Sequence, residues 1–133
     1  MDYTILASEL FLGHPDTGAY DADSAIAAAQ MNEPNREVAK LTSPLEASNA
    51  TDADEFNALS DVEQQKWISV LAWDSINLNA GMGLATAQGI WAGAAGTITR
   101  PALIATRTHL VGRSTEILLG KVRAGDIEYA RAL

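Results

Sequence analysis

The chain has 133 residues, a net charge of -8 and no cysteine. This length predicts one domain with a single core, and the lack of cysteine excludes disulfides, thiolate metal sites and a cysteine nucleophile. The acidic balance argues against a dedicated nucleic-acid-binding protein, because binding to phosphates depends on a basic surface.

Charge is divided unevenly along the sequence. Residues 1–74 hold fourteen acidic and three basic side chains, residues 75–99 hold none, and residues 100–133 hold six basic and three acidic ones. Such a division suits a subunit that meets different neighbours on different sides. Ends of opposite charge favour head-to-tail contacts between copies, which close into rings when the rotation between copies allows it.

The first third of the chain predicts two short helices. Asp2 is placed to cap a helix over residues 3–12, whose apolar residues recur at helical spacing and which ends before a glycine. Asp23 is placed to cap an alanine-rich helix over residues 24–31, which ends near Pro34.

Two capping signals and a strongly apolar segment follow. Residues 43–46 form a capping box with proline at the first helical position, and residues 51–54 place acids in the first turn of another short helix. A third signal at Ser60 opens a helix over 61–73. From residue 67 to 73 every residue except Ser69 is apolar, so this helix is expected to be surrounded by the others. The side chains expected to be packed are Trp67, Ile68, Val70, Leu71 and Trp73.

The uncharged residues 75–99 are long enough to cross a bilayer, but their polar residues and five glycines make them poor membrane-spanning sequence. A close-packing surface is the preferred interpretation, because glycine lets a neighbouring backbone approach. Gly81, Gly89, Gly93 and Gly96 are therefore predicted to be positions of subunit or helix packing. A membrane-acting lysis protein stays the alternative.

The last third predicts three more elements and leaves a fourth open. Thr99 is placed to cap a helix with proline near its start, and alternation over 106–111 is also compatible with a short strand. Ser114 begins a short helix that ends at a glycine, and Asp126 begins the last helix.

These elements together predict an all-α fold. The expected architecture is one helical domain over residues 1–133, a compact bundle of about seven or eight mostly short helices around a central buried helix at 61–73. Residues 121–133 are expected to serve as a docking tail. The partner-binding residues predicted on that tail are Lys121, Arg123, Tyr129, Arg131 and Leu133.

Motifs for catalysis and for cofactors are missing from the sequence. It holds no dinucleotide-binding glycine fingerprint, phosphate-binding loop, nucleophile elbow or His-Glu-x-x-His pair. His14 lies near Asp16, Asp21 and Asp23, but the spacing does not match a calcium loop, and a turn followed by a helix cap is the better interpretation. We expect no enzymatic activity, no metal site and no cofactor.

Three acidic residues, Asp52, Asp54 and Glu55, lie close enough in sequence to suggest a general acid and base. Acids at this spacing more often complement a helix N-terminus, and no apolar cleft is predicted around them. The basic residues after position 99 are spread over three elements, which is typical of a solvated face.

Four segments carry a resemblance to known proteins. Residues 13–20 (GHPDTGAY), the following 21–35, residues 56–61 (FNALSD) and residues 125–131 (GDIEYAR) resemble small proteins encoded among the virion structural genes of tailed bacteriophages. The resemblance covers most of the chain and rests on pattern, without a reactive motif.

The resemblance implies a structural protein of the virion that is assembled in the host cytoplasm. The preferred role is a head-to-tail connector, or adaptor, that forms a homo-oligomeric ring beneath the portal and contacts portal and tail or neck proteins. No membrane and no sequence-specific nucleic acid are expected as partners. A capsid decoration or head completion protein is the alternative.

Overall fold

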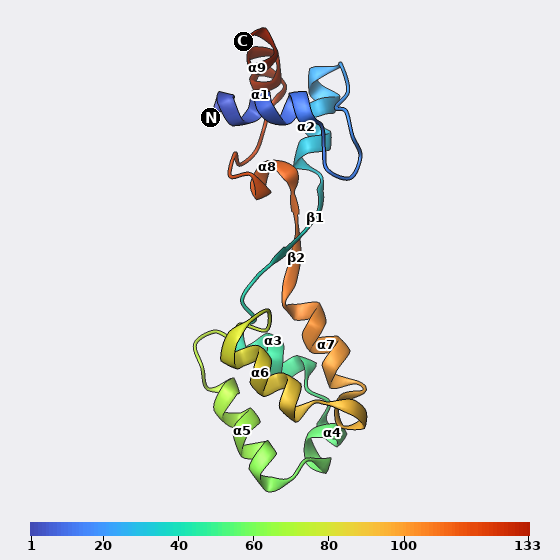
Figure 1. The fold of residues 1–133 in the computed structure, drawn as a ribbon, viewed down its shortest axis with the longest axis vertical. Helices are drawn as coiled ribbons and strands as arrows, with labels where there is room; N and C mark the ends of the chain where they lie inside the picture. Colours follow the sequence, from blue (N-terminus) through green and yellow to red (C-terminus); the bar gives the residue numbers. More distant parts are fainter. The chain divides into compact units, whose positions relative to one another are not determined.

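A computed structural model describes residues 1–133 (Figure 1). It contains nine α-helices, one short 3-10 helix and two strands that pair in an antiparallel sheet. Helices hold 59% of the residues, so the predicted helical character is confirmed. The prediction of a purely all-α fold is wrong because of the sheet.

The chain divides into two compact units. Unit 1 consists of residues 1–38 and 110–133, and unit 2 of residues 39–109. Each unit has its own hydrophobic cluster, where the sequence analysis expected a single core. The single helical domain expected over residues 1–133 stays a prediction.

Unit 1 contains α1 (Tyr3–Leu12), α2 (Ser24–Asn32), α8 (Arg113–Glu116) and α9 (Ala124–Ala132). Asp2 and Asp23 cap the first two helices as predicted, because each side chain accepts hydrogen bonds from the backbone N–H groups of the first turn. Helix α9 packs against both α1 and α2. The core side chains are Leu6, Tyr20, Ala27, Ala28, Met31, Val122, Ile127 and Ala130.

Asn32, the last residue of α2, ties the two sequence-distant parts of unit 1 together. Its amide nitrogen donates to the carbonyl of Val122 at 2.6 Å, and its amide oxygen accepts from the Val122 N–H at 3.0 Å and from the Ser114 hydroxyl at 2.9 Å. Gly112 lies so close to the Asn32 backbone that any Cβ there would overlap it. These contacts dock the returning chain onto α2.

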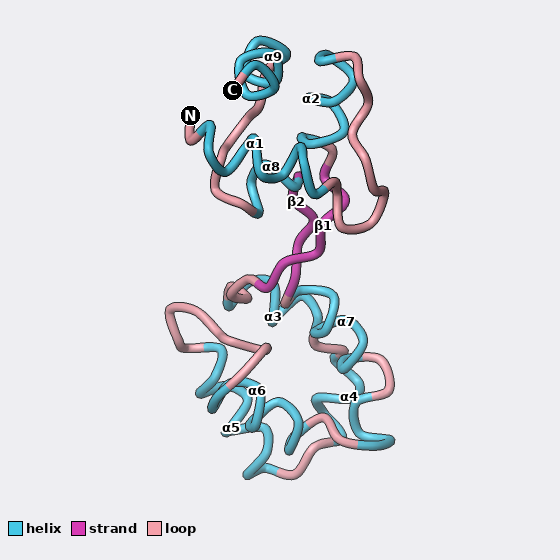
Figure 2. Tube along the Cα trace, turned by 45° about the horizontal axis from the view of Figure 1, so that its top comes forward, coloured by secondary structure: helices cyan, strands magenta, loops and turns pink.

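Strands β1 (Pro34–Ala39) and β2 (Thr108–Gly112) carry the chain from unit 1 into unit 2 and back (Figure 2). The sequence analysis left a short strand over residues 106–111 possible, and β2 is that strand. β1 was not predicted, because its sequence PNREVA lacks apolar alternation. Proline is tolerated at its first position, where no ladder hydrogen bond is needed.

Unit 2 contains α3 (Pro44–Ala50), α4 (Ala53–Ala58), α5 (Asp61–Leu71), α6 (Gly81–Ile90), the 3-10 helix η1 (Gly93–Gly96) and α7 (Thr99–Thr106). The capping box predicted at residues 43–46 is present. Two buried indoles, Trp67 and Trp91, meet edge to face with their ring centres 5.5 Å apart. The other core side chains are Ala47, Leu59, Val70, Ile76, Leu78, Ala87, Ile90 and Leu103.

The predicted central buried helix is wrong. Helix α5 ends at residue 71, and only Trp67 and Val70 on it are buried, while Ile68 is 49% exposed and Trp73 39% exposed. The apolar run continues past the end of the helix, so its residues do not all lie on one helical surface. α5 therefore packs along one stripe at the surface of unit 2.

The N-terminus of α7 is capped from a distance. Thr99 is its first residue and not its cap; the carboxylate of Glu55 accepts from the backbone N–H groups of Ile98 at 3.0 Å and Thr99 at 2.7 Å. Asp52 caps α4 through the Glu55 N–H. The acids at 52–55 thus complement helix N-termini, as the sequence analysis favoured for them.

The four glycines predicted at packing positions differ in their surroundings. Gly96 lies against the Trp91 backbone so closely that a Cβ would overlap it. Gly81 and Gly93 have positive φ angles of 72° and 57° and open space around them, so backbone conformation accounts for both. Gly89 faces open space in a regular helix, and subunit packing there stays a prediction.

Helix α6 offers a matched pair of glycines. A Cβ at Gly83, which was not singled out from the sequence, would collide with the carbonyl of Asn77, whereas a Cβ at Gly89 would meet nothing within 4 Å. Gly83→Ala is expected to lower the melting temperature. Gly89→Ala is expected to raise stability by up to about 1 kcal/mol, since alanine favours the helix. Thermal unfolding of the two variants checks this; equal effects would contradict the packing described here.

Residues 75–99 fold into α6, η1 and connecting loops. Of all helices in the structure, none combines the length and the apolar character that crossing a bilayer requires.

Candidate interaction surface

Helix α1 is apolar on two sides. Its inner side packs into unit 1 through Leu6, which is fully buried, while the outward side chains of the same segment stay exposed. We define the α1 outer face as Met1, Ile5, Phe11 and Leu12, which are 46%, 40%, 90% and 74% exposed. A helix with apolar side chains on the side away from its core is typical of a segment that a partner covers.

Helix α9 adjoins α1 and carries two of the predicted partner-binding residues, Tyr129 and Arg131. The rings of Tyr3 and Tyr129 lie 4.4 Å apart, and the Tyr3 hydroxyl donates to Asp126 at 3.1 Å. The predicted residues Lys121, Arg123, Tyr129, Arg131 and Leu133 are all exposed. Their role in binding stays a prediction.

The segment 121–133 is part of unit 1 and not a detached tail. Val122, Ile127 and Ala130 are 1%, 0% and 4% exposed and belong to the unit 1 core. Arg131 also donates to the backbone carbonyls of Asp21 and Ala22. Removal of this segment is therefore expected to disrupt unit 1, because its apolar side chains complete the core.

The inner side of α1 carries a buried carboxylate. Glu9 is 5% exposed and accepts hydrogen bonds from Arg113 at 2.9 Å and from the Tyr20 hydroxyl at 2.8 Å. Arg113 also binds Glu116, and Glu116 accepts from Arg36 at 3.2 Å. This ion-pair cluster joins α1, β1 and α8.

Hydrogen bonding and charge set the protonation of the cluster. Burial raises the pKa of Glu9, but hydrogen bonds from Arg113 and Tyr20 and the Arg113 charge outweigh burial, so the pKa lies below its ordinary value. The pKa of Tyr20 is raised by burial and by its bond to Glu9. Glu116 has a lowered pKa as well, because Arg113 and Arg36 offset its desolvation.

The lowered pKa of Glu9 predicts a pH dependence of stability. A carboxyl whose pKa is lower in the folded state contributes its stability above the unfolded-state pKa and loses it as the pH falls. Glu9→Gln is therefore expected to destabilise the protein most above about pH 5, with the difference from wild type shrinking toward about pH 3. Urea unfolding at several pH values measures this; a difference that grows in acid would contradict it.

The fold brings acidic and basic segments of the sequence together in each unit. Unit 1 holds ten acidic and five basic residues and unit 2 holds seven and four, so both units are acidic. Arg113 binds acids of its own unit, while Arg131 and Arg100 bind backbone carbonyls of theirs. The basic residues after position 99 do not form a separate positive region, because they are divided between two acidic units.

His14 is held in a turn, as the sequence analysis favoured. Its Nδ1 accepts from the backbone N–H of Asp16 at 3.0 Å, and its Nε2 lies 3.2 Å from the side-chain oxygen of Asn35. Two backbone hydrogen bonds pair His14 with Gly18. The ring is 3% exposed and supports the turn from beneath.

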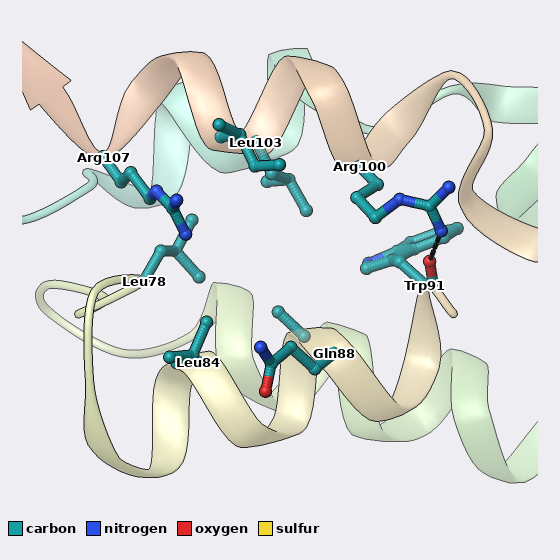
Figure 3. Close-up of a pocket in the computed structure, with 9 residues that line it drawn as sticks. Leu78, Leu84, Gln88, Trp91, Arg100, Leu103 and Arg107 are labelled. Atoms are coloured by element: carbon teal, nitrogen blue, oxygen red, sulfur yellow. Dashed lines mark hydrogen bonds between the residues drawn. The ribbon is translucent and has the colours of Figure 1, made fainter. Parts of the chain in front are cut away.

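A cavity in unit 2 was not predicted. It measures about 120 Å³ and lies between α6 and α7 (Figure 3). Its walls are mostly aliphatic, and Trp91 closes one end. In the sequence, the lining residues of both helices recur at helical spacing. This pattern indicates a cavity only once the two helices are known to face each other. The lining residues are Leu78, Leu84, Ala87, Gln88, Trp91, Arg100, Leu103, Ile104 and Arg107.

Comparison of this chain with protein families, with curated proteins and with solved structures finds no match.

Proposed function

We propose that this protein is a non-enzymatic structural subunit of a tailed-phage virion, a head-to-tail connector that assembles with copies of itself and with portal and neck proteins. The observation that carries the proposal is the α1 outer face, a cluster of large apolar side chains on a helix whose other side already packs into a core. Such a surface is unfavourable in water and favourable in an interface.

The free energy gained by burying these exposed side chains is large enough to support assembly. Phe11 and Leu12 are 90% and 74% exposed, and burying one such side chain contributes about 1.5–3 kcal/mol. Ile5, 40% exposed on the same helix, adds a further apolar side chain. A few buried anchors of this kind dominate the affinity of most protein interfaces.

Three of the four segments that resemble virion proteins, residues 13–20, 21–35 and 125–131, belong to unit 1. Residues 13–20 form the turn directly after α1, and residues 125–131 lie in α9, which packs on α1. The resemblance and the exposed apolar face thus involve neighbouring elements. The helix-dominated fold favours a connector over a capsid decoration protein, since decoration proteins are more often rich in β structure.

Substitution on the α1 outer face tests self-assembly. The double variant Phe11→Ser, Leu12→Ser is expected to keep its melting temperature, because neither side chain is in the core, and to lose the concentration-dependent oligomers that the wild type forms in sedimentation velocity. Val62→Ser, which changes a 65% exposed residue in unit 2, is the matched control and should assemble normally. Equal oligomer content in all three proteins would overturn the assignment of this face.

A further inference from the structure

Two helical faces in unit 2 oppose each other across the cavity. Leu84, Ala87 and Gln88 are spaced so that they share one face of α6, and Trp91 directly follows the helix. Arg100, Leu103 and Ile104 have the same spacing on α7, and Arg107 directly follows that helix. Figure 3 shows the two rows pointing toward one another. The helices present complementary apolar faces and leave space between them.

The space is large enough for a small organic group. Its volume of about 120 Å³ approaches that of an apolar cavity of about 150 Å³ that binds benzene. It is open on one side, with Ile104, 47% exposed, at its edge. An apolar wall of this size gains from contact with a ring or a branched aliphatic group.

One polar atom in the wall has no partner. The Nε1–H of Trp91 is buried and makes no hydrogen bond within the protein, and Trp91 itself is 1% exposed. The nitrogen edge of the ring is turned toward the cavity in Figure 3. Trp67, by contrast, donates its indole N–H to Thr51 at 2.9 Å. A buried donor without an acceptor is unfavourable, so an acceptor placed in the cavity would gain a hydrogen bond from the Trp91 N–H.

A positive charge stands at the same end. The Nη1 atom of Arg100 donates to the carbonyls of Trp91 at 2.9 Å and Gly93 at 3.0 Å, which fixes the guanidinium beside the indole. Both bonds are made by one nitrogen of the guanidinium, Nη1. Arg107 lies near Leu78, at the opposite end (Figure 3).

We infer that this cavity is a binding site for a small apolar carboxylate, an aromatic or branched aliphatic group that fills the space and places its carboxylate against the Trp91 N–H and Arg100. An acceptor satisfies the indole, and a negative charge pairs with the guanidinium in a charge-assisted hydrogen bond. The site goes beyond the proposed role in assembly and does not depend on it.

Benzoate and its neutral isostere benzamide are suitable probes. Titrated into the full-length protein labelled with ¹⁵N, benzoate is expected to shift the Trp91 indole N–H signal saturably at millimolar concentration. Benzamide, which has the same ring but no charge, is expected to bind about five-fold more weakly or worse, because it lacks the ion pair. Absence of a saturable shift, or equal affinities for the two probes, would overturn the inference.

Two variants and one control locate the site. Arg100→Gln is expected to reduce benzoate affinity to that of benzamide, whereas Arg107→Gln should change it less than about two-fold. Because Arg100 also holds the end of α6, Ile104→Trp is the second test: it fills the mouth of the cavity from an exposed position and should abolish the shift in a protein that still folds. Undiminished benzoate binding in Ile104→Trp would place the probe elsewhere and refute the site.

Discussion

Replacing Arg113 by methionine is expected to destabilise the protein by about 3–5 kcal/mol, because it leaves the Glu9 carboxylate buried without its cation. Glu9 is 5% exposed and takes two hydrogen bonds from Arg113. Such a loss is a large part of the whole stability of a small domain. Urea unfolding at neutral pH, followed by circular dichroism, measures the change.

The double variant Glu9→Gln, Arg113→Met is the control for this result. Removing the buried charge together with its partner should restore part of the stability, since the cost arises from the unpaired carboxylate and not from the lost packing of the arginine stem. If the double variant is as unstable as the sum of the two single ones, the cluster acts by packing alone and the electrostatic account is wrong.

Truncation after Gly120 is expected to unfold unit 1. The deletion removes Val122 and Ile127, which are 1% and 0% exposed, together with the helix that covers α1 and α2. At about 1.5–3 kcal/mol for each large side chain, the loss is comparable to the stability of a small domain. Helical circular dichroism should fall by more than the missing residues account for.

A shorter deletion serves as the control. Removing Ala132 and Leu133 takes away exposed residues only, so the melting temperature should stay within a few degrees of the wild type. If the truncation after Gly120 keeps the full helical signal of the remaining residues, α9 is a separable tail and this expectation is wrong.

Local signals at helix ends were the part of the fold that the sequence predicted best. Asp2, Asp23, Ser43 and Ser60 each cap the helix expected of them. These predictions succeed because a cap involves residues two or three positions apart. Thr99 failed in the same role, because its helix is capped by Glu55, which is distant in sequence.

Features that depend on distant contacts could not be predicted. β1 is held by backbone pairing with β2, so its own side chains carry no strand pattern. The apolar run at 67–73 suggested a surrounded helix, but the chain turns away after residue 71. Charge was the most misleading guide: Glu9 and Arg113 lie 104 positions apart and meet in one buried pair, which no count along the sequence reveals.

The sequence predicted only part of the candidate surface. The predicted partner-binding residues on α9 are exposed, but the larger apolar group is on α1, where the sequence suggested an ordinary packed helix. A nearly uniform apolar helix has no preferred side in sequence, so only the fold shows which side chains remain uncovered.

Electron microscopy of purified phage particles, with this protein located by a specific antibody label, tests the central proposal most directly. The proposal predicts label at the junction of head and tail, in a ring of copies beneath the portal. Particles that are complete and infectious but carry no label would contradict it, and label spread over the capsid surface would show a decoration protein instead.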